Sequence, residues 1–292
     1  MTQLIQSLEQ IVDEFDVAVL DQWGVLHNGT VAYPHAAATM QMLQQHGKPI
    51  LIVSNSGKRA ELNRQRIANI GLPVDTISKV VTSGEALWED ITERRLQLNG
   101  KTPRTFFPIC AKSSDPVDWA GASDAIRIQS ELDDSVDAIL LMGLPDGTKA
   151  DVYDSVLALA LEKQLPIICS NPDKTSPRVG GLVTSPGALA DRFETMAGKV
   201  FWYGKPHAAV YRAVIRAFPD VNLNRFLMVG DSLEHDIAGA QNVGFASAFI
   251  RGGIHAADFS TADADEQVAA TTDRLVEGMR VASPDFSLEI LK

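Results

Sequence analysis

Four residues suited to phosphoryl-transfer chemistry stand where a predicted strand ends or a predicted helix begins. Asp21, Ser54 and Asp231 close apolar runs, and Lys205 precedes Pro206 at a helix start. The carboxyl ends of parallel strands meet at one edge of a sheet, so we expect these side chains to lie together. A carboxylate nucleophile, a fixed positive charge and oxygen ligands for a hard cation are what transfer of a phosphoryl group requires.

Each of these signals is weak alone, because a strand-terminal Asp usually caps a helix or turn and Ser-Asn-Ser usually forms a loop. Their order is more informative. The four segments read Val17-Ala-Val-Leu-Asp21-Gln22-Trp23-Gly24, Leu51-Ile-Val-Ser54-Asn55-Ser56, Gly204-Lys205-Pro206-His207 and Val229-Gly230-Asp231-Ser-Leu-Glu-His-Asp236. In this order they resemble the four signature motifs of the haloacid-dehalogenase superfamily, and Gly-Asp-x-x-x-x-Asp is the most specific of them. The resemblance covers the chain up to about residue 260.

The segment between the second and third motifs is long and contains Asn171-Pro172-Asp173. With this insertion the chain resembles class IIA of the superfamily (NagD-like, nitrophenyl-phosphatase-like). The resemblance implies an α/β fold, in which a doubly wound parallel sheet carries an inserted α/β cap domain of the C2 type. We expect residues 1–83 and 200–292 to form the core domain and residues 84–199 to form the cap.

Periodicity in the sequence independently predicts the same fold class. Short apolar runs alternate with amphipathic segments, as in a parallel sheet covered on both faces. The predicted strands are Val17–Leu20, Ile50–Val53, Val80–Val81, Ala138–Met142, Ile167–Cys169, Phe226–Val229 and Ala246–Ile250. Predicted helices lie between Pro34 and Gly47, Lys58 and Gly71, Ala150 and Leu165, and Pro206 and Pro219. The Ser-, Asp- and Pro-rich stretch Lys112–Asp124 is predicted to be a surface loop, and Thr261–Lys292 to be weakly helical.

The resemblance also assigns roles. Asp21 is expected to be the nucleophile that forms an aspartyl-phosphate. Mg2+ is the expected cofactor, since a hard cation prefers oxygen ligands. Its expected ligands are Asp21, the main-chain carbonyl of Trp23, Asp231 and Asp236, the last either through water or as a support for Lys205.

Four residues are expected to bind the phosphate. Lys205 would place a compact positive charge against the phosphoryl oxygens, while Ser54, Asn55 and Ser56 would donate hydrogen bonds to them. Ser54 and Lys205 are expected to be catalytic together with Asp21. The expected substrate is a small phosphorylated metabolite such as a sugar phosphate or nitrophenyl phosphate.

Trp23 departs from the pattern. Phosphatases of this superfamily carry a second Asp here, which protonates the leaving oxygen and then deprotonates the attacking water. An indole N–H only donates hydrogen bonds, so Trp23 does neither. Loss of positioned acid/base catalysis costs roughly 10²- to 10⁴-fold, or about 3 to 5 kcal/mol. We therefore predict a slow, leaving-group-sensitive phosphatase or a relocated acid/base, for which His27 and His207 are candidates.

Two other functions are compatible with the sequence. An aromatic residue at this position also resembles the dehalogenases of the superfamily, which displace halide and protonate no leaving group. Against that function, Asp231 beside Asp21 would be costly without a cation. The third hypothesis is a non-catalytic phosphometabolite-binding protein, which would saturate with ligand and show no turnover.

Composition excludes several partners. The net charge of −11 disfavours binding to nucleic acid or to an anionic membrane. No apolar run reaches membrane-spanning length, and the acidic N-terminal stretch does not resemble a secretory signal. Only Cys110 and Cys169 occur, which fits a reducing cytoplasm. A homodimer through the caps is expected on the resemblance alone.

Within the insertion, Asn171, Asp173, Lys174 and Arg178 cluster after a predicted strand and could contact the non-phosphate part of a substrate. The aromatic residues Trp88, Trp119, Trp202 and Tyr203 are scattered and are expected to pack in a core or an interface.

Overall fold

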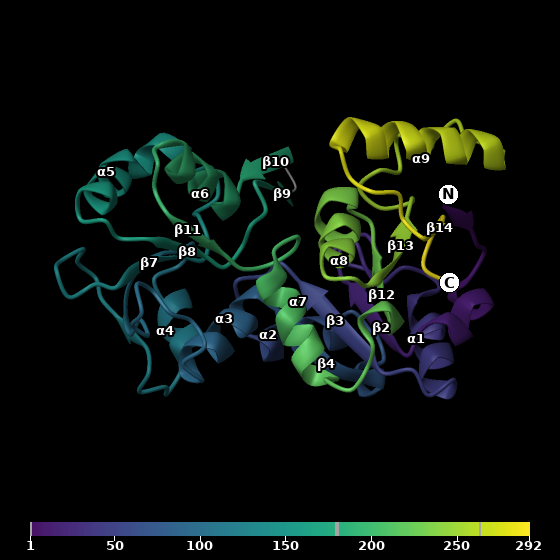
Figure 1. Ribbon diagram of the computed structural model, residues 1–292, viewed down its shortest axis with the longest axis horizontal. Coiled ribbons are helices and arrows are strands. Elements are labelled where there is room, and N and C mark those ends of the chain that lie inside the picture. Colours follow the sequence, from purple (N-terminus) through teal and green to yellow (C-terminus); the bar gives the residue numbers. More distant parts are fainter. Residues whose placement is uncertain (1, 179–180, 263) are drawn as a thin grey trace. The chain divides into compact units, whose positions relative to one another are not determined.

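Apolar runs form the strands of two mainly parallel sheets in the computed structural model, which describes residues 2–178, 181–262 and 264–292 (Figure 1). The chain divides into two compact units. Unit 1 comprises Met1–Ser54, Glu61–Val81 and Lys205–Lys292, and unit 2 comprises Asn55–Ala60 and Thr82–Gly204. The short segment Asn55–Ala60, which we had expected in the core domain, thus groups with unit 2.

The sheet of unit 1 has the strand order β1-β14-β13-β12-β2-β3-β4. Its strands are β1 (Gln3–Leu4), β2 (Val17–Asp21), β3 (Ile50–Ser54), β4 (Ile77–Thr82), β12 (Phe226–Gly230), β13 (Ala246–Ile250) and β14 (Phe286–Leu288). From β2 the chain adds β3 and β4 on one side, and it later adds β12, β13 and β14 on the other. The switch in direction falls between β2 and β12, which run parallel. This doubly wound order confirms the predicted fold class, and in such sheets ligands bind at the carboxyl ends of the strands where the direction switches.

Burial explains why these segments are strands. Every residue of β2, β3 and β12 is buried, as expected of central strands covered on both faces. The helices of unit 1 are α1 (Ala36–Gln45), α2 (Ala60–Asn69), α7 (Ala208–Ala217), α8 (Ala238–Asn242) and α9 (Asp265–Met279). A π-helical turn, Leu233–Ile237, joins β12 to α8. Phe249 of β13 packs with Leu275 and Val276 of α9.

Unit 2 has its own sheet, with the order β11-β8-β7-β5-β6 and parallel pairing. Its strands are β5 (Thr105–Ile109), β6 (Arg127–Ile128), β7 (Ala138–Leu141), β8 (Ile167–Cys169) and β11 (Val200–Trp202), and β9 (Thr175–Arg178) pairs antiparallel with β10 (Gly181–Thr184). Its helices are α3 (Ser83–Thr92), α4 (Asp115–Ala120), α5 (Asp154–Glu162) and α6 (Pro186–Thr195). Apolar side chains of α5, α6 and the central strands share one core, so unit 2 has a hydrophobic centre of its own.

The prediction that Lys112–Asp124 is a surface loop was wrong in part. Residues 115–120 form α4, with Pro116 in its first turn. The helix buries Trp119, whose side chain is 2% exposed and whose indole N–H donates to the carbonyl of Gly84 at 2.8 Å. The Asp- and Pro-rich composition reflects the helix start, and one tryptophan provides the apolar contact that holds the helix.

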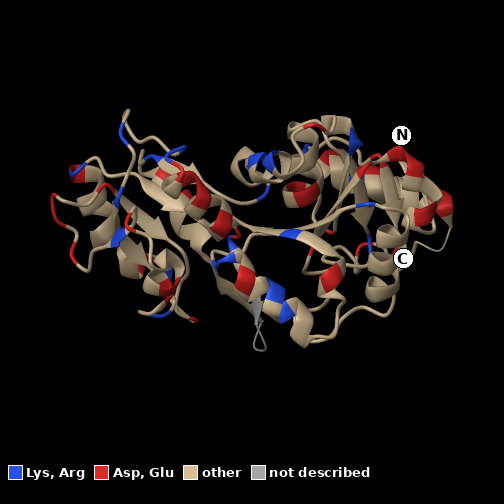
Figure 2. Ribbon diagram, turned by 90° about the horizontal axis from the view of Figure 1, so that it is seen from below, with Lys and Arg blue, Asp and Glu red and all other residues tan. Residues whose placement is uncertain are grey.

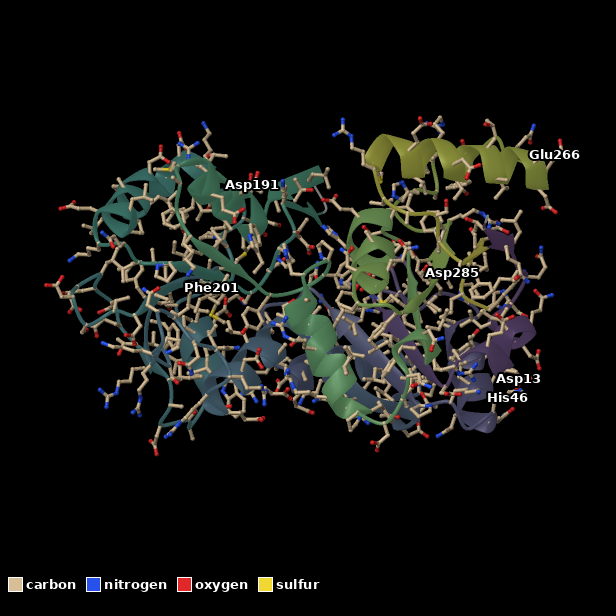
Figure 3. All side chains as sticks on the ribbon, in the orientation of Figure 1. Asp13, His46, Asp191, Phe201, Glu266 and Asp285 are labelled. Carbon is tan, nitrogen blue, oxygen red and sulfur yellow. The ribbon has the colours of Figure 1, made fainter. Side chains whose placement is uncertain are left out.

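The C-terminal region is more ordered than its sequence indicates. After α9, the strand β14 pairs parallel with both β13 and β1. Asp285, labelled in Figure 3, accepts hydrogen bonds from the amide and the hydroxyl of Ser247, both at 2.9 Å. These bonds fix the start of β14 beside β13.

Lys and Arg positions alternate with Asp and Glu positions along the ribbon of the described residues (Figure 2). Among the described helices, none is long and apolar enough to cross a membrane.

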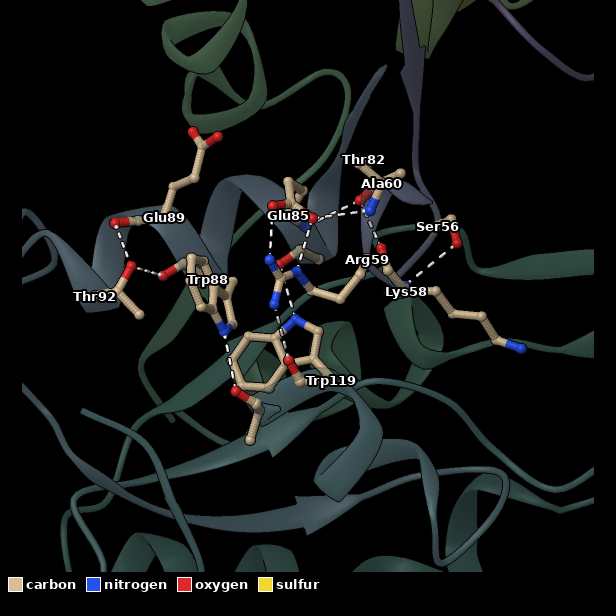
Figure 4. Close-up of polar contacts among 12 residues, drawn as sticks. Ser56, Lys58, Arg59, Ala60, Thr82, Glu85, Trp88, Glu89, Thr92 and Trp119 are labelled. Atoms are coloured by element: carbon tan, nitrogen blue, oxygen red, sulfur yellow. Dashed lines mark hydrogen bonds and ion pairs between the residues drawn. The ribbon is translucent and has the colours of Figure 1, made fainter. Parts of the chain in front are cut away.

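Arg59 and Glu85 attach the segment Asn55–Ala60 to α3 within unit 2 (Figure 4). The guanidinium donates to both carboxylate oxygens of Glu85, at 2.7 and 2.9 Å, and stacks 3.8 Å from the ring centroid of Trp88. Glu85 also accepts the amide of Ala60 at 2.8 Å. One largely buried carboxylate therefore ties this segment to the helix.

Glu85→Ala should lower the free energy of unfolding of unit 2 by about 2 to 3 kcal/mol, because Arg59 and an amide lose a charged partner together. Denaturant unfolding followed by tryptophan fluorescence would measure the loss, since Trp88 and Trp119 lie in this unit. Glu131→Ala, at an exposed position of the same unit, is the control and should stay within about 0.5 kcal/mol of wild type. Equal stability of the two variants would contradict the assigned role.

Candidate active site

Three buried side chains meet at the carboxyl ends of β2 and β12. Asp21 is the last residue of β2, Asp236 lies in the π-helical turn after β12, and Lys205 precedes α7. The ammonium of Lys205 donates a hydrogen bond to Asp21 Oδ1 and another, at 2.6 Å, to Asp236 Oδ1. All three residues are more than nine-tenths buried. Residues far apart in the sequence thus form one ion-paired cluster within unit 1.

Asp231 completes the cluster. It follows β12, is 4% exposed, and accepts the amide of Ile254 at 2.8 Å. Oxygens of Asp21, Asp231 and Asp236 all lie within 4.8 Å of one another. The ammonium of Lys205 faces these three carboxyl groups, so the cluster would carry excess negative charge if all three were ionised. Its oxygen donors fit a hard divalent cation.

The electrostatics of the carboxylates support the same conclusion. Burial raises the pKa of Asp21 to about 7, against the opposing charge of Lys205. Burial and the charges of Asp21 and Asp236 raise the pKa of Asp231 to about 8. Burial alone would lower the pKa of Lys205, but its two carboxylate partners outweigh it and raise that pKa. Without a further cation the cluster therefore tends to retain protons, as expected for crowded carboxylates.

Gly24 makes room for Asp231. Its φ is +78°, and a Cβ at this position would lie 1.7 Å from Asp231 Oδ2. Gly253 crowds the same carboxylate, since its Cβ would lie 2.1 Å from Oδ2. The glycine in the first motif is thus required both for its backbone conformation and for the carboxylate behind it.

Gly24→Ala should displace Asp231 and abolish the rise in melting temperature that is expected when a divalent cation such as Mg2+ binds the carboxylates. Gly47→Ala is a matched control, because Gly47 also has a positive φ, +68°, yet no atom lies within 4 Å of its Cβ position. Both changes introduce backbone strain of about 1 to 2 kcal/mol, but only Gly24→Ala disturbs a carboxylate. Thermal unfolding with and without Mg2+ separates the two effects. An unchanged Mg2+ response in Gly24→Ala would contradict the assignment.

The predicted phosphate-binding residues divide between the units. Ser54 ends β3, which pairs with β2 so that Val53 lies opposite Asp21, and Ser54 is buried. Asn55 and Ser56 belong to unit 2. There, Asn55 Nδ2 donates to Asp173 Oδ1 at 2.7 Å. The structure therefore brings Asp21, Lys205, Asp231 and Asp236 together, with Ser54 at the neighbouring strand end.

Trp23 is 39% exposed, in contrast to the buried cluster beside it. Its ring occupies the space that a side chain at position 29 would need, since a Cβ on Gly29 would lie 2.1 Å from the indole. The guanidinium of Arg66 lies 5.4 Å from the ring centroid, and the ring of His27 approaches edge-on at 5.5 Å. The indole is therefore held in place on three sides.

His27 is fully buried, and its Nδ1 accepts the amide of Gly29 at 2.9 Å. Burial lowers its pKa to about 4, so the ring is neutral at physiological pH. His207 is the N-terminal flanking residue of α7, two positions after Lys205. Neither histidine belongs to the carboxylate cluster found among the described residues.

Sequence reasoning missed several residues around the cluster. Tyr33 lies near Asp231, and burial and the Asp231 charge raise its pKa. The hydroxyl of Tyr211 donates to the main-chain carbonyls of His235 and Asp236, at 3.1 and 3.2 Å. A lone tyrosine on a loop or a helix gives no signal, because only the folded chain brings it to the strand ends.

The candidate substrate-contacting residues of the insertion already have partners within unit 2. Asn171 Oδ1 accepts the amide of Asp173 at 3.0 Å, and Lys174 pairs with Asp191 at 3.2 Å. The side chain of Arg178 lies outside the part of the chain that the structure describes.

Comparisons with known proteins agree with this geometry. Residues 18–102 match the family described as haloacid dehalogenase-like hydrolase, and residues 202–278 match the family described as HAD-hydrolase-like. Chronophin from Bos taurus is 25% identical over 280 residues, covering 85% of this chain and 85% of its own. The 4-nitrophenylphosphatase of Schizosaccharomyces pombe is 26% identical over 269 residues, covering 81% and 83%.

A solved structure shows the same fold over nearly the whole chain. The haloacid dehalogenase-like hydrolase from Brucella suis 1330 superposes with a TM-score of 0.77 at 27% identity, and covers 99% of this chain and 100% of its own. Both family matches contain segments of the carboxylate and lysine cluster, and the curated relatives span both units. The chain therefore belongs to the haloacid-dehalogenase superfamily of hydrolases, and its relatives include nitrophenylphosphatase-like proteins of the class IIA type.

Proposed function

We propose that this chain is a Mg2+-dependent phosphatase that hydrolyses small phosphorylated metabolites through an aspartyl-phosphate on Asp21. The observation that carries the proposal is the buried cluster, in which Lys205 bridges Asp21 and Asp236 while oxygens of Asp231 lie within 4.8 Å of theirs. A nucleophilic carboxylate can approach a phosphate dianion only where positive charge offsets the repulsion. Relatives that are named phosphatases support the same activity.

Each residue of the site has a distinct role in the proposed reaction. Asp21 Oδ attacks phosphorus, and Lys205 holds the nucleophile while neutralising charge on the phosphoryl oxygens. Ser54, followed by Asn55 and Ser56, is proposed to donate hydrogen bonds to those oxygens. Mg2+ would be held by Asp21, Asp231 and the carbonyl of Trp23, with Asp236 supporting through Lys205 or water. When bound, it supplies the remaining positive charge.

We propose that unit 2 acts as the cap that selects the substrate, that the protein works in the cytoplasm, and that copies pair through unit 2. The argument for the first is that unit 2 has a core of its own and belongs to the insertion between the second and third motifs.

Dehalogenation fits the cluster less well. Displacement of halide from carbon requires no divalent cation, whereas three buried carboxylates with one lysine require additional positive charge. A non-catalytic binder would keep the cluster but release no product.

Release of nitrophenolate from 4-nitrophenyl phosphate tests the proposal. The wild type should release it with Mg2+ and stop when a chelator is added. Saturable binding of phosphate without any release would favour the non-catalytic binder, and absence of both would refute the proposed function.

Stabilisation by Mg2+ should increase with pH. The raised pKa values of Asp21 and Asp231, about 7 and about 8, mean that the folded metal-free protein retains protons that the unfolded chain has lost. The stability from these groups is fully present below their unfolded pKa of about 4 and disappears as pH rises through their folded values. Mg2+ binds the ionised carboxylates, so the stabilisation that it provides should increase over the same range of pH.

Thermal unfolding at about pH 5.5 and about pH 8.5 measures this dependence. The rise in melting temperature with Mg2+ should be larger at the higher pH, by roughly 2 to 4 °C for each kcal/mol gained. A rise of the same size at both pH values would contradict metal binding at these carboxylates.

A further inference from the structure

Trp23 lies two residues after the proposed nucleophile, and its side chain is more exposed than that of Asp21. Asp21 is 7% exposed and Trp23 is 39% exposed. Gly29, Arg66 and His27 hold the ring, as described above. An indole neither gives up nor takes a proton in water, so the side chain of Trp23 supplies no acid/base group at this position.

The side chains of the cluster have other roles in the proposed reaction. Asp21 attacks, and Lys205 donates to Asp21 and Asp236. Asp236 also accepts the amide of Ser232 at 3.0 Å, and Asp231 accepts that of Ile254. Asp231 and Asp236 are thus engaged in orienting the cluster and in the proposed cation site, and neither has a proposed role in proton transfer.

The buried histidine beside Trp23 does not supply the missing acid/base group. Since Nδ1 of His27 accepts the amide of Gly29, its lone pair is used and the ring proton is on Nε2. The ring is fully buried, so Nε2 does not reach bulk water. Among the described residues, the side chains of Asp21, Lys205, Asp231 and Asp236 thus have other proposed roles, and Trp23 and His27 add no proton-transfer group to them.

From this we infer that Asp21 is phosphorylated rapidly only by donors whose leaving oxygen departs as a stable anion, with acyl phosphates as the substrate class, and that the aspartyl-phosphate then hydrolyses slowly. The inference rests on the proposed function. A carboxylate leaving group, like a nitrophenolate, departs without a proton, whereas a sugar or glycerol alkoxide does not.

The two steps balance without an internal acid or base. In the first, Asp21 Oδ forms a bond to phosphorus, and the bond from phosphorus to the leaving oxygen breaks with its electron pair on that oxygen. In the second, water attacks phosphorus, the bond to Asp21 breaks, and the proton of water passes to a phosphate oxygen or to solvent. Because no residue removes that proton, the second step limits turnover of good donors and the phosphorylated enzyme accumulates.

Rapid-mixing kinetics with 4-nitrophenyl phosphate and Mg2+ test the inference. We expect a burst of nitrophenolate equal to the enzyme concentration, followed by slow turnover, and a protein mass increased by one phosphoryl group. Across aryl phosphates of rising leaving-group pKa, kcat/KM should fall steeply. Acetyl phosphate should likewise phosphorylate the enzyme, whereas glycerol phosphate should not.

Trp23→Asp and Trp23→Phe form a matched pair of variants. The carboxylate of Trp23→Asp should flatten the dependence on leaving-group pKa, remove the burst, and raise kcat/KM for alkyl phosphates relative to wild type by about 10²- to 10⁴-fold. Trp23→Phe adds no proton-transfer group and should retain both the steep dependence and the burst. The burst and the leaving-group dependence of the wild type test the inference even if Trp23→Asp does not fold.

The outcomes separate the inference from the proposed function. A shallow dependence without a burst in the wild type would overturn the inference while leaving the phosphatase intact. If that dependence became steep in Tyr33→Phe or His207→Gln, the residue concerned would be the acid/base. Absence of both turnover and phosphorylation with every donor would overturn the proposed function and the inference with it.

Discussion

Asp21→Asn is expected to abolish turnover and phosphorylation of the enzyme, with a loss of at least about 10⁴-fold in kcat. An amide oxygen is a poor nucleophile toward phosphorus, and no other carboxylate of the cluster lacks a partner of its own. Nitrophenolate release and intact-protein mass after reaction with acetyl phosphate measure the two effects. Asp220→Asn, at an exposed position after α7, controls for the change of charge.

The same variant should be at least as stable as wild type at pH 8 without Mg2+. Burial holds the pKa of Asp21 near 7, so the ionised side chain is unfavourable there and a neutral amide removes that cost. Stability and activity therefore change in opposite directions, as at other strained functional sites. A variant that loses activity because it unfolds would leave Asp21 without an assigned role in the chemistry.

Lys205→Met should destabilise unit 1 by about 3 to 5 kcal/mol near pH 8 and abolish activity as well. Its ammonium is the cation bonded to both Asp21 and Asp236 in the interior of the cluster. Methionine fills a similar volume, so packing is largely retained and the loss reports charge. Denaturant unfolding monitored by circular dichroism would measure it.

The destabilisation of Lys205→Met should shrink toward pH 5, because the unpaired carboxylates can then protonate. Lys149→Met, at an exposed position of unit 2, should change stability by no more than about 0.5 kcal/mol. A loss for Lys205→Met that is independent of pH would indicate a packing defect and contradict the ion-pair assignment.

The central strands could be predicted because both faces of each are buried. A run such as Val17–Leu20 is apolar at every position, so the sequence identifies it as a buried strand without showing which helices cover it. The cluster of Asp21, Lys205, Asp231 and Asp236 followed from the strand ends, since parallel strands place their carboxyl ends at a common edge. The short strand β14 could not be predicted in this way. Its three residues form a strand because they pair with β13 and β1, and the local sequence does not show that pairing.

Contacts that depend on tertiary packing could not be predicted. Nothing local in the sequence shows that Asn55 donates to Asp173, more than a hundred residues away, or that Glu85 accepts from Arg59. The state of His27 likewise required the fold. A histidine ordinarily titrates near neutrality, which made His27 an acid/base candidate, whereas burial lowers its pKa and keeps the ring neutral.

The strand order has a consequence for biosynthesis. β2 lies in the interior of its sheet, yet one of its neighbours is β12, so that Val17 pairs with Phe226. A ribosome would release β2, β3 and β4 long before β12 exists, while nearly all of unit 2 would emerge in one continuous stretch. Unit 2 is thus expected to fold first on the nascent chain, while one edge of β2 stays open and prone to association until the last third of the chain arrives. Chaperone dependence during translation should accordingly be concentrated in the first eighty residues.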